Sequence, residues 1–460
     1  MRPTAIGAAA AWGLAALSGC HSAATPPAFR HVLLVSIDTL RADHLGCYGS
    51  PFVRSPHIDR VASEGLLFEQ HISVAPSTLA SHTSLMTGTY PRTHGAAHNR
   101  VRVGDGNRML AELLSEAGFE TAAFIGGLPL ASAVHFQQGF GHYREPRPPQ
   151  HRVPGAEVTD AALAWIGAAA RERSFAFVHY FDVHQPYVHG EPWDSMYRRD
   201  DLGELPGPGP LRRALARGEP GARELSRATR AAYAGGVTYV DDQIGRLLEG
   251  LSRSGWLDEA LVVVTSDHGE AMDEHADELW NHGHTLYDET VRTPLVMRFP
   301  GAWRAGTRIP QLVANIDLVP TLLELLGLPL PDGIEGRSLV PLLLGGAGPV
   351  RDLVFVEATR PHDEAHEAGT RWPNERKLRG VRTQRWKLVH APLPDRIQAF
   401  DLDSDPGEQT DLSAAARTGA PWDALRSSLD AWAAGEAAPA TRAELDAWTE
   451  EQLGALGYAE

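Results

Sequence analysis

The chain has 460 residues, with 42 Lys and Arg against 58 Asp and Glu, which gives a formal net charge of −16. Hydrophobic residues make up 43% and charged residues 22%, a composition typical of a packed soluble protein. The acidic balance argues against nucleic-acid binding, because binding a run of phosphates requires clustered positive charge. The two cysteines, Cys20 and Cys47, are too few for a disulfide framework or a zinc–thiolate cluster.

The N-terminus has the features of a targeting segment. Arg2 precedes an apolar, alanine-rich run, residues 5–17, which is too short to span a bilayer. The run ends in LSGC, which resembles the lipobox of bacterial lipoprotein signal peptides and has Cys20 as its last residue. This resemblance implies cleavage before Cys20, lipidation of its thiol and anchoring to a membrane of the bacterial cell envelope. The alternative is an ordinary secretory signal with a chance cysteine, and either signal predicts export.

Apolar, β-branched runs alternate with helical patterns through the following part of the chain. The runs typical of buried strands are residues 31–37, 121–125, 175–180, 260–266 and 295–299. The patterns typical of helices are residues 58–64, 109–117, 158–170, 232–251 and 317–326. This alternation predicts a doubly wound α/β domain, with a mostly parallel sheet and helices on both faces.

The pattern changes from about residue 352. Four short runs with turn residues between them, VFVEA, LRGVRT, WKLVHA and IQAFDL, predict a small antiparallel sheet. Residues 422–456 are predicted to be helical. Residues 189–228, rich in Pro, Gly and charge, are predicted to form a long surface loop that covers the site. The predicted units are a signal segment at 1–20, a tether at 21–29, an α/β domain at 30–350 and a C-terminal subdomain at 351–460.

Acidic residues and histidines follow three of the predicted strands, where the chain leaves the sheet. Asp38 follows the first strand, Asp267 and His268 follow LVVVTS, and Asp182 and His184 follow FAFVHYF. In an open α/β sheet, ligands bind beyond the carboxyl ends of the strands. Any one of these residues alone is more simply explained as capping the next loop. Oxygen and imidazole groups gathered at three strand ends instead predict a site for a divalent cation.

A candidate nucleophile lies in the segment APSTLASHTSLMTG, residues 75–88, which begins with turn residues and continues into a helix-compatible stretch. A hydroxyl at a helix start lies among unpaired backbone N–H groups and at the positive end of the helix dipole, where anions bind. Ser77 or Thr78 would most commonly serve only as the helix N-cap. Taken alone, the segment therefore does not indicate catalysis.

Together these segments resemble the sulfatase family of the alkaline-phosphatase superfamily. The matching stretches include VLLVSIDTLRADHLGCYG, APSTLASHTSLMTGTYPRTHG, HYFDVHQPY, TSDHGEAMDEH, HGHTLYDETVRTPLVMRFPG and FDLDSDPGEQTDL, and they occur in family order between about residues 31 and 415.

By position, the resemblance makes Asp38, Asp267 and His268 ligands of a divalent cation (calcium, manganese, zinc or magnesium), with the nucleophile completing the coordination sphere. It implies that His184 contacts the ester or its leaving group and that Asn99 binds oxygens of the anion. It also implies that His282 or His284 protonates the leaving oxygen. Two alternatives are not decided by the sequence. Asp182 and these three histidines could form a second metal site, or the histidines could only form hydrogen bonds.

The nucleophile position departs from the family pattern. Family members carry a Cys or Ser in a Cys/Ser-x-Pro-x-Arg motif that is oxidised to formylglycine. In this sequence Thr78 occupies the nucleophile position and His82 the position of the arginine, which makes His82 a candidate substrate-binding residue. Threonine cannot become the aldehyde, whereas a metal-activated threonine alkoxide suits in-line phosphoryl transfer. The family's Gly-Lys is also replaced, by Gly126-Gly127.

The sequence therefore predicts an exported, lipid-anchored, metal-dependent hydrolase of sulfate or phosphate esters with Thr78 as its nucleophile. The expected partners are sulfated or phosphorylated glycans or small molecules and, through Cys20, a membrane; no nucleic acid is expected. Two alternatives stay open. One is a transferase that passes a phospho group to a cell-surface acceptor, and the other is a catalytically inactive lipoprotein that binds anionic glycans.

Overall fold

The structure is a computed structural model that describes residues 25–168, 172–198, 202–203, 205–276, 278–360, 377–393, 395–414 and 419–456. The predicted signal segment, with the proposed lipidation site Cys20, lies outside these residues. No helix in the described part of the chain combines the length and the apolar composition needed to cross a membrane.

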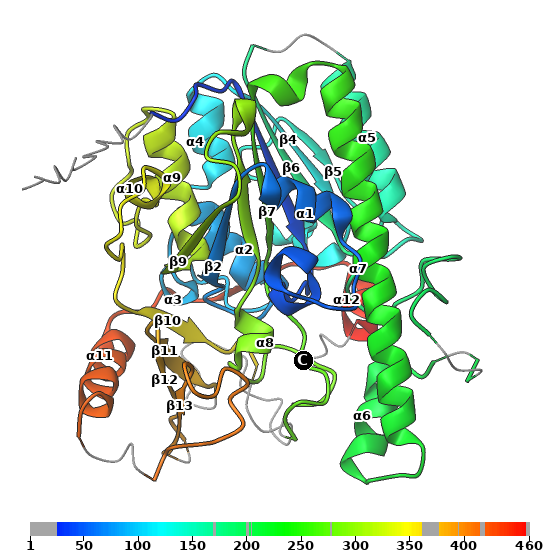
Figure 1. Ribbon diagram of the computed structural model, residues 1–460, viewed down its shortest axis with the longest axis vertical. Helices are drawn as coiled ribbons and strands as arrows, with labels where there is room; N and C mark the ends of the chain where they lie inside the picture. Colours follow the sequence, from blue (N-terminus) through cyan, green and yellow to red (C-terminus); the bar gives the residue numbers. More distant parts are fainter. Residues whose placement is uncertain are drawn as a thin grey trace, which may run out of the picture.

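An 8-stranded sheet forms the centre of the molecule (Figure 1). Its strands are β1 (His31–Ile37), β2 (Leu66–Ile72), β4 (Glu120–Ile125), β5 (His142–Arg144), β6 (Ser174–Tyr180), β7 (Ala260–Ser266), β8 (Leu295–Arg298) and β9 (Thr307–Ala314). Their order across the sheet is β5-β4-β6-β1-β7-β8-β2-β9. β8 runs antiparallel to β7 and β2, and the other neighbouring pairs are parallel, which confirms the predicted mostly parallel sheet.

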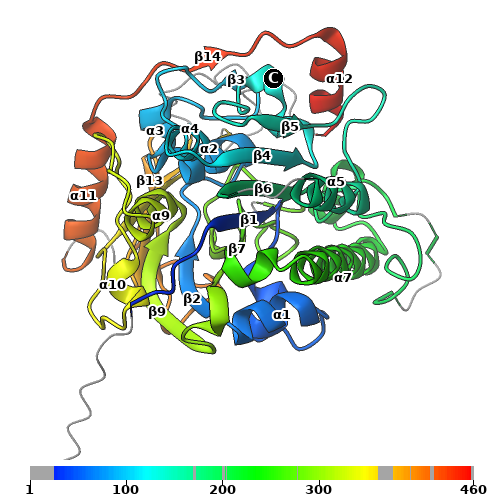
Figure 2. The same ribbon diagram turned by 90° about the horizontal axis from the view of Figure 1, so that it is seen from above.

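Helices cover both faces of the sheet, as predicted (Figure 2). One face carries α1 (Pro56–Ser63), α5 (Gly155–Gly167) and α7 (Ala222–Arg253), and the other carries α2 (Thr78–Thr87), α4 (Leu110–Glu116) and α9 (Leu318–Leu325). Alternate residues of β1 enter two different apolar clusters: Val32 and Leu34 pack in one, and Leu33 and Val35 in the other. Because both faces of the strand are buried, β1 reads as a continuous apolar run in the sequence.

The loop predicted for residues 189–228 is wrong in its second half. α6 (Pro208–Ala216) and the first turns of α7 form there. The buried residues Ala222, Ser226, Thr229 and Tyr233 of α7 follow one another at helical spacing, so they pack one face of the helix against the protein. Because Ala222, Ser226 and Thr229 are small or polar, the start of this helical pattern is hidden in the sequence. Three short helices lie in other connections: α3 (Pro91–His94), α8 (Asp288–Val291) and α10 (Val340–Leu343).

A second, smaller sheet confirms the predicted antiparallel C-terminal unit. It contains β10 (Val354–Glu357), β11 (Arg379–Arg382), β12 (Trp386–Ala391) and β13 (Arg396–Asp401), each antiparallel to the next. α11 (Trp422–Ala434) packs on this sheet through Trp422, Leu425 and Leu429. The tail is only partly helical, because β14 (Thr441–Arg442) pairs with β3 (Val101–Arg102) before α12 (Ala447–Ala455) begins.

Asp241 links the long helix α7 to the start of α1. Its carboxylate accepts hydrogen bonds from the backbone N–H groups of His57, at 3.0 Å, and Ile58, at 2.8 Å. Burial raises the pKa of Asp241 to about 7, although these two hydrogen bonds lower it.

The charge on Asp241 makes folding stability depend on pH. Because its pKa is higher in the folded than in the unfolded protein, this group should reduce the free energy of unfolding as pH rises from about 4 to about 7, by up to about 4 kcal/mol. Asp241→Asn cannot ionise, so we expect denaturant titrations at a series of pH values to show a smaller loss over this range. The exposed Asp160→Asn is the control, and an unchanged pH dependence in Asp241→Asn would contradict the assignment.

Candidate active site

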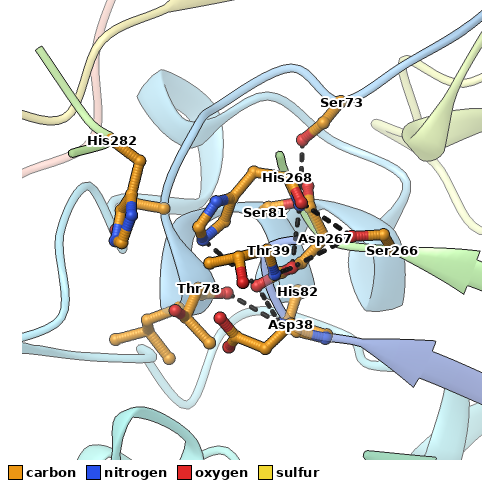
Figure 3. Close-up of polar contacts among 12 residues, drawn as sticks. Asp38, Thr39, Ser73, Thr78, Ser81, His82, Ser266, Asp267, His268 and His282 are labelled. Carbon is orange, nitrogen blue, oxygen red and sulfur yellow. Dashed lines mark hydrogen bonds and ion pairs between the residues drawn. The ribbon is translucent and has the colours of Figure 1, made fainter. Parts of the chain in front are cut away.

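The carboxyl ends of β1 and β7 bring Asp38 and Asp267 together. The two strands are parallel neighbours with Ile37 opposite Ser266, so the residues that follow them emerge side by side. Both side chains are buried. Oδ1 of Asp267 accepts hydrogen bonds from the backbone N–H groups of Thr39, at 3.2 Å, and His268, at 2.8 Å. The acidic site thus lies at the strand ends where the sequence predicted it (Figure 3).

His268 adds an imidazole lone pair to these carboxylates. Asp38, Asp267 and His268 each offer a ligand atom within 4.8 Å of the others. Nδ1 of His268 lies 2.8 Å from the carbonyl oxygen of Gly269. Because a carbonyl can only accept, Nδ1 carries the proton and Nε2 carries the lone pair. Nε2 lies 3.4 Å from Oδ2 of Asp267, so the two atoms could ligate the same cation.

The cluster has the unsatisfied atoms expected of a cation site. Within the described part of the chain, five buried ligand atoms have no hydrogen-bond partner of regular geometry: both carboxylate oxygens of Asp38, Oδ2 of Asp267, Nε2 of His268 and the hydroxyl oxygen of Thr78. Burial raises the pKa of Asp38 to about 7, while His268 and the nearby Thr78 hydroxyl lower it. Burial and the Asp38 carboxylate raise the pKa of Asp267. Two carboxylates, a hydroxyl and an imidazole therefore fit a divalent cation.

Thr78 is the first residue of α2 and lies beside the Asp38 carboxylate (Figure 3). Asn99 holds this helix start in place: its Oδ1 accepts hydrogen bonds from the Leu79 N–H, at 2.8 Å, and from the Ser77 hydroxyl, at 3.1 Å. Nδ2 of Asn99 is buried and has no hydrogen-bond partner among the residues that the structure describes. Asn99 thus caps the helix with its oxygen and keeps its amide N–H groups as donors near Thr78.

His82 lies one turn after Thr78 and is fully buried. Its Nδ1 donates to the carbonyl oxygen of Thr78 at 2.8 Å, so its Nε2 accepts from the Ser36 hydroxyl, also at 2.8 Å. Both ring nitrogens have protein partners, and burial lowers the pKa of His82 to about 3. This geometry corrects the prediction that His82 binds substrate, because neither nitrogen is placed to contact an anion. It favours a supporting role beneath the cluster.

His282, one of the two predicted leaving-group histidines, reaches the cluster. Its ring centroid lies 4.5 Å from that of His268 and 5.4 Å from that of His184, which itself stacks on Phe181 at 4.5 Å. Nδ1 of His282 lies 3.3 Å from Oε1 of Glu270. Burial, with His268 and His184 nearby, lowers the pKa of His282 well below its usual range.

The backbone N–H of His284 bonds to the Glu278 carboxylate at 3.3 Å, and its side chain is near enough to His282 to help lower the pKa of His282. Asp182 does not join the cluster. Its Oδ1 accepts the Gly155 N–H at 3.0 Å, at the start of α5, and burial raises its pKa to about 6. Asp182 belongs to neither of the two ligand groups that the described residues form, which are Asp38–Asp267–His268 and His57–Asp241–Asp242.

Two buried residues of the site were missed from the sequence. Glu270 contacts His282, and His179 lies 3.4 Å from Oδ2 of Asp38 through its Nε2. Each residue has a sequence feature that could have drawn attention to it. Glu270 is the next polar side chain after His268, and His179 is a polar residue inside the apolar strand β6. Neither signal was specific enough to assign a role.

Comparison with known proteins identifies the family. The model of the sulfatase family matches residues 30–328. The chain belongs to the sulfatase family. A second family model, described as the C-terminal part of N-sulphoglucosamine sulphohydrolase, matches residues 276–433. The family and its members support the assignment of this protein as an ester hydrolase.

The proteins and structures similar to this chain carry names that refer to different esters. The multifunctional alkaline phosphatase superfamily protein PehA of Trinickia caryophylli is 25% identical, over 84% of this chain and 91% of its own length. An arylsulfatase of Clostridium perfringens is also 25% identical, over 83% and 90%. The phosphonate monoester hydrolase of Agrobacterium radiobacter has a similar structure, with a TM-score of 0.70, 24% identity and coverage of 88% and 94%. A structure solved in complex with D-glucosamine-2-N,6-O-disulfate has a TM-score of 0.72, 20% identity and coverage of 88% and 97%.

The cap on α2 gives a stability test. Asn99→Ala removes the acceptor of the Leu79 N–H and should lower the free energy of unfolding by about 1–2 kcal/mol, measured by denaturant titration. Ser77→Ala is the control, because it removes only the hydroxyl donor and leaves the Leu79 N–H paired, so its loss should be smaller. A loss in Ser77→Ala equal to that in Asn99→Ala would contradict the capping role.

Proposed function

We propose that this sulfatase-family protein hydrolyses sulfate, phosphate or phosphonate esters with unmodified Thr78 as nucleophile and a divalent cation held by Asp38, Asp267, His268 and Thr78. The observation that carries the proposal is the meeting of buried, unsatisfied lone pairs from β1, β7 and α2 around the Thr78 hydroxyl. The donor set suits calcium, manganese, magnesium or zinc. When bound, such a cation supplies positive charge that lowers the pKa of a hydroxyl and offsets the charge of the anion.

The start of α2 supplies the anion-binding surroundings. Thr78 lies at the N-terminus of a 10-residue helix, where backbone N–H groups and the helix dipole favour a negative group. Nδ2 of Asn99 adds a side-chain donor at the same end of the helix. These donors would hold the ester oxygens so that Thr78 attacks sulfur or phosphorus in line with the leaving oxygen.

The leaving oxygen requires a proton donor, and the geometry supports His282 in that role, with His184 next to it. In the first step the Thr78 alkoxide oxygen bonds to sulfur or phosphorus, the ester bond breaks, and the leaving oxygen takes a proton from protonated His282. Because burial lowers the pKa of His282, the negative charge of the bound ester would have to favour this protonated form. In the second step water attacks the Thr78 adduct, its proton returns to His282, and the Thr78 oxygen leaves. Each proton and bond is balanced over the cycle.

Threonine at position 78 affects which class of ester the enzyme should hydrolyse faster. A formylglycine adduct can release sulfate by breaking a C–O bond, whereas a Thr78 adduct must be released by attack of water on sulfur or phosphorus. Relatives named for phosphonate esters and for sulfated sugars fit both substrate classes. We expect a higher kcat/KM on phosphate or phosphonate esters than on sulfate esters that carry the same leaving group.

Substitution of Thr78 tests the proposal. Thr78→Ala should lower kcat on aryl phosphate, phosphonate and sulfate esters by about 10³-fold or more, because the covalent route is lost. Thr78→Ser keeps the hydroxyl and should stay within about 10-fold of the wild type. Chelator should abolish turnover of the wild type, and added Mn²⁺ should restore it.

Other outcomes identify the alternatives. Turnover that survives in Thr78→Ala would contradict the nucleophile. Retained metal with no turnover on any of the three esters would favour an inactive anion-binding protein. Product that forms only with an added alcohol or glycan acceptor would favour a transferase.

A further inference from the structure

His179 is a buried histidine without a satisfied ring nitrogen. It is the second-last residue of β6 and lies opposite Ser36 of the neighbouring strand β1. Its side chain is 0% exposed, and neither Nδ1 nor Nε2 has a hydrogen-bond partner of regular geometry among the described residues. A buried polar group left unsatisfied costs about 1–3 kcal/mol of stability, so the presence of an imidazole at this position requires an explanation.

Packing does not explain it. The His179 ring stacks on Phe177 at a centroid distance of 6.2 Å and lies at the same distance from Phe181. These aromatic neighbours would accommodate an apolar side chain of similar size without an unsatisfied nitrogen.

The ring points instead to the carboxylate cluster. Nε2 of His179 lies 3.4 Å from Oδ2 of Asp38, an oxygen that is itself unsatisfied. On the same side, Nδ1 of His82 lies 3.5 Å from Oδ2 of Asp267. The rings of His82 and His179 meet edge to face at 5.0 Å. Each of the two carboxylates therefore faces one buried imidazole, and the two imidazoles form a layer beneath them.

We propose that His179 is a positioning residue for the cation site: its Nε2–H holds Oδ2 of Asp38, so that Oδ1 is directed at the cation. The inference rests on the metal site of the proposed function. A ligating carboxylate that is also hydrogen-bonded keeps one orientation, and loss of such an outer partner typically weakens metal binding. A 3.4 Å separation needs only a small movement of Asp38 to become a regular hydrogen bond.

His179 tests this layer better than His82 does. His82 also donates to the Thr78 carbonyl and accepts from Ser36, so its replacement would disturb the start of α2 as well. No such second bond is formed by His179 within the described structure. A change in metal affinity on substituting His179 therefore reports on Asp38.

The experiment measures Mn²⁺ binding to the metal-stripped full chain by isothermal titration calorimetry. His179→Leu should raise the Kd for Mn²⁺ about 10–100-fold, whereas His179→Gln, whose amide can still donate to Asp38, should stay within about 5-fold of the wild type. The thermal unfolding midpoint of metal-free His179→Leu should equal or exceed that of the wild type, because an unsatisfied buried group has been removed.

His71 provides a matched control. It is also a buried strand histidine, on β2, and its Nδ1 bonds to the Thr293 hydroxyl at 2.9 Å. His71→Leu should leave the Kd for Mn²⁺ unchanged and lower the unfolding midpoint.

The outcomes separate this inference from the proposed function. An unchanged Kd for Mn²⁺ in His179→Leu would overturn the positioning role. So would a lower unfolding midpoint of metal-free His179→Leu, if His179→Gln also failed to restore the affinity for Mn²⁺. Wild-type protein that binds Mn²⁺ but hydrolyses none of the esters would refute the proposed function and leave the affinity test of His179 standing. Wild-type protein that binds none of Mn²⁺, Ca²⁺, Mg²⁺ and Zn²⁺ would refute the metal site and this inference together.

Discussion

Two carboxylates buried at the ends of adjacent parallel strands are the constraint on which the site depends. Asp38 and Asp267 are brought together by the pairing of β1 with β7, and burial favours the neutral form of both. Among the described residues, no Lys or Arg side chain forms an ion pair with either carboxylate. His268 lies beside them, with its Nε2 3.4 Å from Oδ2 of Asp267. A divalent cation bound as in the proposed function would neutralise this concentration of buried acidic groups. The geometry is therefore better explained by metal binding than by structural support.

The packing of α2 against the sheet places Thr78 beside this cluster. Ser81, one turn into the helix, donates to the backbone carbonyl of Asp267 at 2.6 Å and bonds to Ser73 at 2.9 Å. Asn315 donates to both the carbonyl and the hydroxyl of Ser81. These buried hydrogen bonds fix the helix to the end of β7, while Asn99 fixes its first turn. The position of Thr78, the proposed nucleophile, is thus set by the end of the same strand that precedes Asp267.

Much of the fold and the centre of the site could be predicted from the sequence. Continuous apolar runs indicated buried parallel strands, and parallel neighbours necessarily place the next residues, Asp38 and Asp267, side by side. The antiparallel direction of β8 could not be predicted from the sequence, because a short buried strand has the same composition in either direction. The supporting residues His179 and Glu270 were missed because their roles depend on which strands and loops become neighbours. Asp182 follows a strand as Asp38 does, yet its side chain turns to α5.

The central claim is that a cation binds within bonding reach of the Thr78 hydroxyl. Crystals grown or soaked with Mn²⁺ test it directly through the anomalous difference map. The account predicts a peak among Asp38, Asp267 and His268, with Oγ1 of Thr78 at a ligand distance of about 2.0–2.6 Å. A peak only at His57, Asp241 and Asp242, the other ligand group of the described structure, would contradict the account, as would a Thr78 hydroxyl turned away from the ion.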